Sequence, residues 1–330
     1  VSAQIADYKK ANNLPIFQPA RERVKLQDVA EKAGPEMANY TRVLYSMLFE
    51  LSRSYQSKRN REFSPLYKSI TQAIEHTPKL FPQAPMVACQ GVEGAYSQIA
   101  CEKIFKNPFI MYFKSFEAVF SAIDQGLCQY GILPIENSTA GFVITNYDLL
   151  SRYDNYIVGE IYVPVDHVLL GVPGASVSDV KTVYSHNQAL MQCSEYLDSH
   201  GDWNQVSVLN TAAAAKKVME EGDKTQAAVA SRTAGELYGL AELKTSISNE
   251  RGNTTRFLVL SREPVYEKKA SKVTVTFEVP HVSGSLYKIL GNFIFNGVNM
   301  RMIESRPIPD KPFEYRFFVD IEGNLSHAPV

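Results

Sequence analysis

The segment MVACQGVEGAYSQIA, residues 86–100, places a short apolar run directly before a glycine-containing turn and a helical pattern. Met86 to Cys89 form the apolar run, and the helical pattern starts at Ser97. An apolar run of this length between turn residues is typical of a buried strand. The same order of strand, turn and helix recurs between residues 85 and 262. This alternation predicts an α/β domain of about 175 residues.

The residues before this domain have a different pattern. From Pro35 to Gln56 the apolar residues recur three or four positions apart, which predicts one long amphipathic helix. Shorter helical patterns cover about 1–11, 20–33 and 65–74. Because helices without strands bury their apolar faces only against one another, residues 1–78 are expected to form a helical bundle, which a second subunit can complete.

The residues after the α/β domain predict a third, smaller domain at 272–330. Val273 to Val279 alternate with polar residues as a strand does, and a helical pattern and two further strands follow. This order is the first part of a ferredoxin-like βαββαβ unit. Since the chain stops at Val330 without a second helix or a fourth strand, we expect this α+β domain to be truncated.

The composition limits the classes of function. With 34 basic and 35 acidic residues among 330, the chain has no basic excess that indicates nucleic-acid binding. No apolar run approaches the roughly 18 residues of a membrane span. The four cysteines lack metal-ligand spacing, so we expect reduced thiols in a cytoplasmic protein, and neither a metal nor a cofactor. Val1 is an unusual start, and we expect further residues upstream.

Polar residues of the α/β domain follow the predicted strands. The set comprises Ser97, Asn137, Ser138, Ser185 and Thr211. Each alone has an ordinary interpretation as a helix cap or a turn residue, and His186 and Gln192 have equally ordinary ones as a structural residue and an exposed helix position. Since ligands of open α/β sheets bind at the carboxyl ends of strands, their shared location predicts a site for a small anion between two lobes.

The segment NTTRF, residues 253–257, contributes a second group of polar side chains. Thr254 and Thr255 supply hydroxyls and Arg256 supplies a guanidinium, just before a predicted strand at 257–260. An arginine at this place can bind a carboxylate with two parallel hydrogen bonds. It can equally be an ordinary surface arginine at the start of a strand.

Four segments of the α/β domain resemble prephenate dehydratase in residue identity, order and spacing. They are GVEGAYS (91–97), PIENSTAG (134–141), SHNQALMQC (185–193) and NTTRF (253–257). The resemblance implies a two-lobed fold similar to periplasmic binding proteins. It implies that Thr255 is the catalytic residue, that Arg256 binds a substrate carboxylate, and that the same cleft is lined by Asn137, Ser138, Ser185, Gln192, Ser97 and Thr211.

The two flanking domains resemble known modules as well. SGSLY (283–287) and ESRP (304–307) resemble the phenylalanine-binding segments of the ACT regulatory domain. The implied allosteric residues are Gly284, Ser285, Leu286, Glu304, Ser305, Arg306 and Pro307. KKANNLPIFQPARE (9–22) and SRSYQ (52–56) resemble the all-helical chorismate mutase. The implied substrate-binding residues are Lys9, Gln18, Arg21, Glu22, Ser52 and Gln56.

Taken together, the three segments resemble the bifunctional chorismate mutase–prephenate dehydratase family of phenylalanine biosynthesis. The resemblance implies chorismate and prephenate as substrates, phenylalanine as inhibitor, and a homodimer or higher homo-oligomer. The two arginines that this family carries in its first helix would precede Val1, so we expect weak mutase activity from the chain as it stands. Two alternatives stay open: an arogenate dehydratase, and a non-catalytic sensor of amino acids or dicarboxylates.

Overall fold

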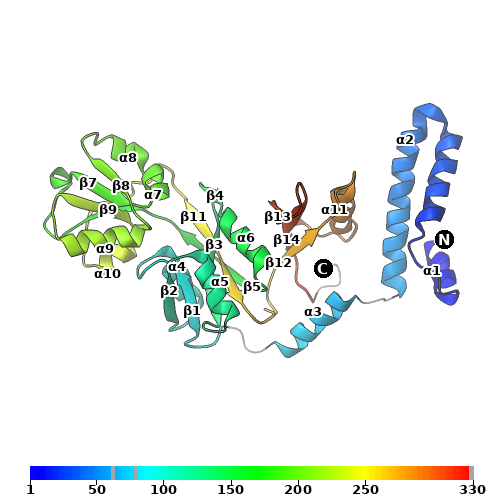
Figure 1. Cartoon of the computed structure of the whole chain (residues 1–330), viewed down its shortest axis with the longest axis horizontal. Helices are drawn as coiled ribbons and strands as arrows, with labels where there is room; N and C mark the ends of the chain where they lie inside the picture. Colours follow the sequence, from blue (N-terminus) through cyan, green and yellow to red (C-terminus); the bar gives the residue numbers. More distant parts are fainter. Residues whose placement is uncertain (61–63, 78–80, 327–330) are drawn as a thin grey trace. The chain divides into compact units, whose positions relative to one another are not determined.

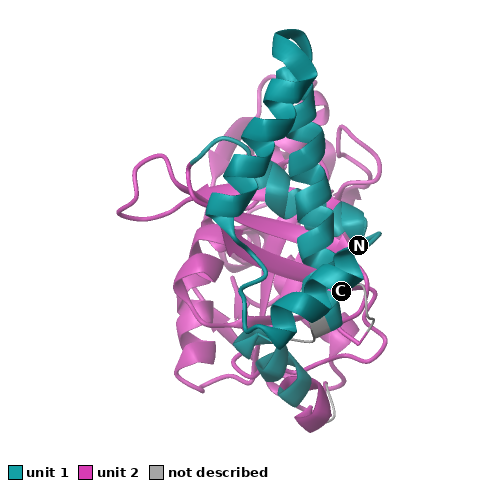
Figure 2. Cartoon of the chain, turned by 90° about the vertical axis from the view of Figure 1, so that its right-hand side faces the viewer, with its two compact units in different colours: residues 1–72, 282–300, 327–330 teal, residues 73–281, 301–326 magenta. Residues whose placement is uncertain are grey.

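The computed structural model describes residues 1–60, 64–77 and 81–326, which fall into two compact units. The first unit comprises the described residues up to Gln72 together with 282–300, and the second comprises those of 73–281 with 301–326 (Figures 1 and 2). The predicted boundary residue Pro78 and the terminal Val330 lie outside the described residues. The three-domain division at 1–78, 85–262 and 272–330 therefore stays a proposal.

The first unit is helical, as predicted. Its helices are α1 (Ser2–Ala11), α2 (Pro19–Asn60), the first part of α3 (Pro65–His76), and α11 (Ser285–Phe295). Helix α2 is interrupted at Gly34, whose φ of 77° and ψ of 166° are not helical. Pro35 follows, and proline is favoured in the first turn of a helix. The break makes α2 a pair of antiparallel helices, which confirms the predicted helix start at Pro35 (Figure 1).

The second unit begins with an α/β lobe, here called the first lobe. Its sheet has the strand order β2-β1-β3-β11-β5, with β4 paired to β3. The strands are β1 (Met86–Gln90), β2 (Phe109–Phe113), β3 (Tyr130–Asn137), β4 (Gly141–Phe142), β5 (Tyr156–Pro164) and β11 (Thr254–Ser261). The helices of this lobe are α4 (Tyr96–Ile104), α5 (Phe116–Asp124) and α6 (Ile144–Arg152).

The chain leaves this sheet after β5, forms a second α/β lobe, and returns in β11 (Figure 1). The second lobe has a separate sheet with the order β10-β6-β9-β7-β8. Its strands are β6 (Val168–Gly171), β7 (Thr182–Ser185), β8 (Asn204–Ser207), β9 (Gln226–Ala230) and β10 (Ala241–Lys244). Its helices are η1 (Val177–Asp179), α7 (Asn187–Gln192), α8 (Ser194–Asp198), α9 (Thr211–Glu221) and α10 (Arg232–Leu237).

Two details of the second lobe concern the starts of β8 and α9. Strand β8 begins at Asn204, where its pairing with β7 starts, and leaves Leu209 exposed. Thr211, for which a helix cap was one ordinary interpretation, does not cap α9. The cap is Asn210, whose side-chain oxygen accepts a hydrogen bond from the backbone N–H of Ala213 at 2.7 Å. An asparagine oxygen reaches the free amides of the first turn as well as a hydroxyl does.

A third sheet follows with the strand order β12-β14-β13, here called the C-terminal sheet. Its strands are β12 (Lys272–Glu278), β13 (Met300–Pro307) and β14 (Tyr315–Glu322). The predicted order of strand, helix, strand and strand is thereby confirmed. Phe318 of β14 belongs to the same apolar core as Tyr147 of the first lobe, and their rings meet edge to face at 5.1 Å. The C-terminal sheet therefore packs against the first lobe.

Cys89, Cys101, Cys128 and Cys193 are buried free thiols. Among the described residues, every helix is too short or too polar to cross a lipid bilayer.

Candidate active sites

Two side chains on neighbouring strands of the first lobe, Asn137 and Thr255, contact each other. Asn137 at the end of β3 lies opposite Thr255 in β11. The Asn137 amide nitrogen donates to the Thr255 hydroxyl at 2.9 Å and to the side-chain oxygen of Asn253 at 2.7 Å. Because the Thr255 oxygen accepts this bond, its own hydrogen stays available for a further acceptor.

The side-chain oxygen of Asn137 is held in place by the turn that follows it. It accepts hydrogen bonds from the backbone N–H of Thr139 at 3.1 Å, from the Thr139 hydroxyl at 2.8 Å and from the backbone N–H of Ala140 at 2.9 Å. These bonds assign the oxygen and nitrogen of the amide unambiguously, since only the oxygen accepts. The Asn137 nitrogen must therefore point toward Thr255.

The second lobe reaches this cluster through Gln192 of α7. The Gln192 amide nitrogen donates to the Thr139 hydroxyl at 2.9 Å and approaches the Asn137 oxygen at 3.4 Å. Since Asn137, Thr139 and Thr255 belong to the first lobe, Gln192 connects the two lobes at the cluster. The structure thus brings together three of the predicted residues, Asn137, Gln192 and Thr255.

A buried histidine behind Gln192 was missed by the sequence analysis. His167, directly before β6, is 2% exposed, and its Nε2 lies 3.2 Å from the Gln192 side-chain oxygen. Burial lowers the pKa of His167, although the hydrogen bond to Gln192 and the charge of Asp166 oppose this shift. Since the Gln192 oxygen only accepts, the neutral imidazole carries its proton on Nε2. His167 thereby fixes which way the Gln192 amide points.

Two predicted cleft residues are buried and already bonded to backbone. The Ser97 hydroxyl donates to the carbonyl of Gln90 at 2.6 Å, and the Ser185 hydroxyl donates to the carbonyl of Val229 at 2.6 Å. Ser97 is 4% exposed and Ser185 is fully buried. The prediction that they line the cleft is therefore wrong in this structure, because each hydroxyl satisfies a carbonyl group of a neighbouring strand end or strand.

Ser138 lies beside the Asn137–Thr255 pair, whereas Thr211 and His186 stand at the N-termini of helices. The Ser138 hydroxyl accepts a hydrogen bond from the backbone N–H of Thr254 at 3.0 Å, which joins the ends of β3 and β11. Thr211 is half-buried in the first turn of α9. The exposed His186 caps α7, and its Nδ1 accepts from the backbone N–H of Gln188 at 3.2 Å.

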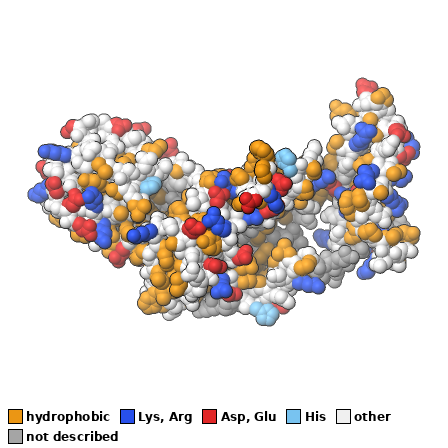
Figure 3. Space-filling model, viewed as in Figure 1, with side chains coloured by type: hydrophobic (Ala, Val, Ile, Leu, Met, Phe, Trp, Pro, Cys, Tyr) orange, Lys and Arg blue, Asp and Glu red, His pale blue; other side chains and the backbone are white. Residues whose placement is uncertain are grey.

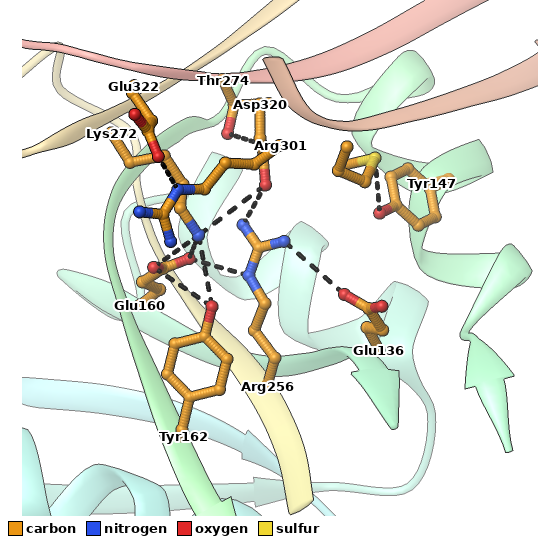
Figure 4. A network of polar contacts seen from close by, with 11 residues as sticks. Glu136, Tyr147, Glu160, Tyr162, Arg256, Lys272, Thr274, Arg301, Asp320 and Glu322 are labelled. Atoms are coloured by element: carbon orange, nitrogen blue, oxygen red, sulfur yellow. Dashed lines mark hydrogen bonds and ion pairs between the residues drawn. The ribbon is translucent and has the colours of Figure 1, made fainter. Parts of the chain in front are cut away.

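Arg256 does not share a face with Thr255, which corrects the prediction that it binds a substrate carboxylate there. Successive side chains of a strand point to opposite faces of the sheet. The Arg256 guanidinium contacts Glu160 of β5 at 2.7 Å, Asp320 of β14 at 2.6 Å and Glu136 at 3.8 Å (Figure 4). Burial lowers the pKa of Arg256, but the carboxylates of Asp320 and Glu160 outweigh it and leave a net rise.

A separate polar cluster occupies the first unit. Gln56 is 3% exposed, donates to the Ser52 hydroxyl at 3.0 Å, and has a side-chain oxygen without a partner among the described residues. Glu22 forms an ion pair with Arg53, which the sequence analysis did not single out. The Lys9 side chain is buried and donates to the carbonyl of Ile16. Burial lowers the pKa of Lys9, whereas the Glu22 charge opposes this shift.

Two further predicted mutase residues stand at the edge of this cluster. Gln18 is half-buried and Arg21 is exposed. Lys9 and Gln56 are buried, and Glu22 and Ser52 are half-buried.

The predicted regulatory residues have distinct local settings. Gly284 has a φ of 81° at the start of α11, a conformation that favours glycine, and Ser285 and Leu286 begin the helix. Glu304, Ser305, Arg306 and Pro307 end strand β13. The Arg306 guanidinium contacts both carboxylate oxygens of Asp148 in α6, at 2.7 and 3.1 Å. Arg306 therefore connects the C-terminal sheet to the first lobe.

Comparison with known proteins places these clusters in a family. Residues 87–265, more than half of the chain, match the family model described as prephenate dehydratase. The chain belongs to the prephenate dehydratase family. Residues 1–57 match the model of chorismate mutase type II. The resemblances to prephenate dehydratase and to the helical chorismate mutase are thereby confirmed, and the resemblance to the ACT domain stays a prediction.

The individual relatives agree with this family. The bifunctional chorismate mutase/prephenate dehydratase of Buchnera aphidicola is 31% identical over 98% of this chain and 83% of its own length. Arogenate dehydratase/prephenate dehydratase 1 of Arabidopsis thaliana is 36% identical over 81% of this chain and 72% of its own.

Solved structures with the same fold include two at TM-scores near 0.7. The prephenate dehydratase of Arthrobacter aurescens, solved with L-Phe, has a TM-score of 0.69 and 27% identity over 74% of this chain and 83% of its own. GqqA, described as a novel type of quorum quenching acylase, has a TM-score of 0.68 and 34% identity over 74% of this chain and 89% of its own.

In this prephenate dehydratase family member, the sequence held signals for most of the residues that the analysis missed. Asn253, Thr139 and Arg53 lie inside the segments NTTRF, PIENSTAG and SRSYQ that carry the resemblance. The sequence around His167 shows only that it precedes an apolar run. Other polar residues at strand starts have the same position, so this does not single out His167.

Proposed function

We propose that this chain converts prephenate to phenylpyruvate at the Asn137–Thr255 pair, and that its helical unit rearranges chorismate to prephenate. The observation that carries the proposal is the 2.9 Å hydrogen bond from the Asn137 amide to the Thr255 hydroxyl. This bond fixes the Thr255 oxygen as an acceptor and leaves the Thr255 hydrogen available for another acceptor. The pair lies where Gln192 of the second lobe contacts Thr139 of the first lobe.

The reaction requires a donor for a poor leaving group. Prephenate carries a ring hydroxyl and, on the opposite ring carbon, a carboxylate. The C–O bond breaks as the carboxylate leaves as CO2, and the electron pair of the broken C–C bond makes the ring aromatic. The departing hydroxyl takes up a proton and leaves as water. A positioned donor at this oxygen lowers the barrier because charge develops on it in the transition state.

Thr255 is suited to be this donor. Its oxygen is occupied as an acceptor by Asn137, so its O–H can donate to the leaving hydroxyl. Asn137 is fixed by Thr139 and Ala140, and Gln192 is fixed by His167. This chain of hydrogen bonds holds the donor in one orientation before substrate binds, and pre-organisation of this kind reduces the reorganisation needed during the reaction.

The substrate carboxylates need donors other than Arg256, whose guanidinium lies on the opposite face of the sheet. Asn253 is suited to this role: it is 4% exposed, and its amide nitrogen has no hydrogen-bond partner among the described residues. A buried donor without a partner costs about 1–3 kcal/mol, and a bound carboxylate would remove that cost. Ser138, next to Asn137, is a second candidate for contact with substrate.

The mutase proposal rests on the polar cluster of the helical unit. Rearrangement of chorismate builds up negative charge on an ether oxygen between two carboxylates, so cations and amide donors stabilise its transition state. Lys9 and Gln56 are buried and supply such groups, and Ser52 lies between Gln56 and Ser2 with hydrogen bonds of 3.0 Å to each. Gln18, Arg21 and Glu22 complete the proposed set, and Arg53 orients Glu22.

We also propose that the C-terminal segments form an ACT-like regulatory module that binds phenylalanine. Support comes from the strand order of the C-terminal sheet, from the ESRP segment in β13, and from the Arthrobacter aurescens relative solved with L-Phe. The proposed phenylalanine residues are Gly284, Ser285, Leu286, Glu304, Ser305, Arg306 and Pro307. The cytoplasmic location stays a prediction.

A homodimer or higher homo-oligomer is part of the proposal. Apolar side chains that recur three or four positions apart along α2 are exposed in the single chain. Figure 3 shows apolar groups on this unit. The exposed set includes Met37, Tyr40, Leu44, Leu48 and Leu51. A second copy of α2 would bury this stripe. Light scattering at increasing concentration tests this, and a monomer at all concentrations would contradict it.

Arogenate is the second candidate substrate, because the Arabidopsis thaliana relative is an arogenate dehydratase/prephenate dehydratase. Arogenate differs from prephenate by an amino group in place of the side-chain keto oxygen. The bacterial bifunctional relative, which covers 98% of this chain, favours prephenate. Its alignment extends over the helical unit as well.

One set of assays decides among these functions. The purified chain receives chorismate, prephenate or arogenate separately, and phenylpyruvate, prephenate and phenylalanine are quantified as products. We expect phenylpyruvate from prephenate at a higher kcat/KM than phenylalanine from arogenate. Faster turnover of arogenate would reverse the substrate assignment. Binding of prephenate without any product would instead indicate the non-catalytic sensor.

A further inference from the structure

Arg256 joins the strand that carries Thr255 to the C-terminal sheet. It is 6% exposed, although it is charged, and its guanidinium lies between Glu160 of the first lobe and Asp320 of β14 (Figure 4). Burying a guanidinium is costly unless carboxylates accompany it. Arg256 is therefore held in place by its charged partners.

Asp320 is itself fixed within the C-terminal sheet. It is 1% exposed, and its carboxylate accepts a hydrogen bond from the Thr274 hydroxyl at 2.6 Å. Lys272 contacts Glu160 at 2.7 Å and approaches Asp320 at 3.9 Å. Arg256 and Lys272 thus both lie between Glu160 of the first-lobe sheet and Asp320 of the C-terminal sheet. Movement of β14 would displace the guanidinium or break a buried ion pair.

The backbone around Arg256 pairs regularly with β5 but irregularly with β3. Against β5, Thr255 lies opposite Val163 and Arg256 opposite Tyr162 without a shift, whereas the register against β3 shifts directly after Arg256. On the Arg256 side of the sheet a cavity of about 400 Å³ is lined by Arg256, Lys272, Arg301, Asp320, Glu136 and other residues. The guanidinium borders this cavity, and its ion pairs with Glu160 and Asp320 hold it at the cavity wall.

We propose that Arg256, held by Asp320, is a positioning residue for Thr255, so that the C-terminal sheet is part of the dehydratase machinery. The inference rests on the proposed function of Thr255. Thr255 and Arg256 share a peptide bond, and the two side chains anchor the strand from opposite faces. Loss of the Asp320 anchor should allow the strand end to shift and should lengthen the contact from Thr255 to the leaving hydroxyl.

The test is Asp320→Asn, which removes the charge but keeps the shape and an oxygen for Thr274. Glu322→Gln is the matched control, because Glu322 lies on the same face of β14 as Asp320 but forms a more exposed ion pair, with Arg301 at 2.6 Å. We expect the kcat for prephenate to fall about 10- to 100-fold in Asp320→Asn, since small displacements cost this much. KM should change less than about twofold, because ground-state binding does not use the Thr255 donor.

The outcomes separate this inference from the proposed function. No phenylpyruvate from the unaltered chain would remove the proposed function itself. Normal turnover in the unaltered chain with an unchanged kcat in Asp320→Asn would overturn the inference alone. An equal loss in Glu322→Gln would also overturn it, because the effect would then belong to the sheet in general.

A second variant keeps the test decisive if Asp320→Asn does not fold, as judged by circular dichroism. Thr274→Val removes only the hydroxyl that fixes Asp320 and keeps the shape of the side chain. A several-fold loss of kcat with an unchanged KM is expected, and an unchanged kcat would overturn the proposal. Arg256→Gln should also lose kcat, and combining it with Asp320→Asn should add little, because both changes break one contact.

Discussion

Thr255 and Arg256 are neighbours in β11 whose side chains reach opposite faces of the first-lobe sheet. The Thr255 hydroxyl contacts Asn137 at 2.9 Å, and the Arg256 guanidinium contacts Asp320 at 2.6 Å. One strand end therefore carries the proposed proton donor on one face and an ionic anchor on the other. In this arrangement Arg256 can position the proposed proton donor without touching the substrate.

Replacing Thr255 by alanine should abolish most dehydratase turnover. We expect kcat for prephenate to fall about 10²- to 10⁴-fold, the range for loss of a general acid. Thr255→Ser should retain part of the activity because it keeps a hydroxyl. Thr254→Ala is the control, since the Thr254 hydroxyl donates to the carbonyl of Gly252 at 3.2 Å. Steady-state assays measure both, and near-normal turnover in Thr255→Ala would remove the assignment.

His167 should make the stability of the second unit depend on pH. Its pKa in the folded protein is lowered by burial, so the unfolded chain binds the proton more readily. The stabilisation is complete above the ordinary pKa of about 6.5 and is lost as the pH falls below that value toward the folded pKa. Denaturant midpoints should drop more between pH 7.5 and 5.5 in the unaltered chain than in His167→Gln.

An exposed histidine supplies the control for this experiment. His281→Gln should lose stability over the same pH range as the unaltered chain, because His281 is exposed. An equal pH dependence in His167→Gln and in the unaltered chain would contradict the buried neutral state. His167→Gln should also lower kcat for prephenate, since it releases the Gln192 amide.

Lys9 should matter for the helical unit and not for the dehydratase. Lys9→Met keeps a long side chain but removes the buried ammonium, so the chain's own chorismate turnover should fall about 10²-fold. Prephenate turnover should be unchanged. Lys10→Met is the matched control, because Lys10 is the adjacent and exposed lysine. Equal effects of the two substitutions on chorismate turnover would rule out a specific role for Lys9.

Gly34 should be needed for the bend in α2. Its φ of 77° and ψ of 166° lie in a region that is essentially restricted to glycine. The space around a Cβ at this position is open, so any cost comes from the backbone. Gly34→Ala should lower the free energy of unfolding of the helical unit by about 1–3 kcal/mol. Urea unfolding followed by circular dichroism measures this, with Glu36→Gln as control, and unchanged midpoints would refute it.

Most of the element order was predictable because its signals are local. The apolar spacing before Gln56 predicted the second half of α2. The apolar run from Met86, followed by a turn and a helical pattern from Ser97, predicted β1 and α4. The site was predictable only in part. Asn137, Gln192 and Thr255 come together, but Ser97 and Ser185 are buried against backbone carbonyl groups. A hydroxyl after a strand gives the same sequence signal whether it bonds a ligand or a carbonyl.

The sequence by itself determined the strand and helix order, the family and the residue that we propose as proton donor, because periodicity and short motifs act between residues close along the chain. Only the tertiary structure decided that Arg256 pairs with Asp320 and that His167 orients Gln192. Charge pairing and hydrogen bonding depend on distances through space, and these partners lie far apart in the sequence. Their positions are fixed only when the two lobes and the C-terminal sheet have packed together.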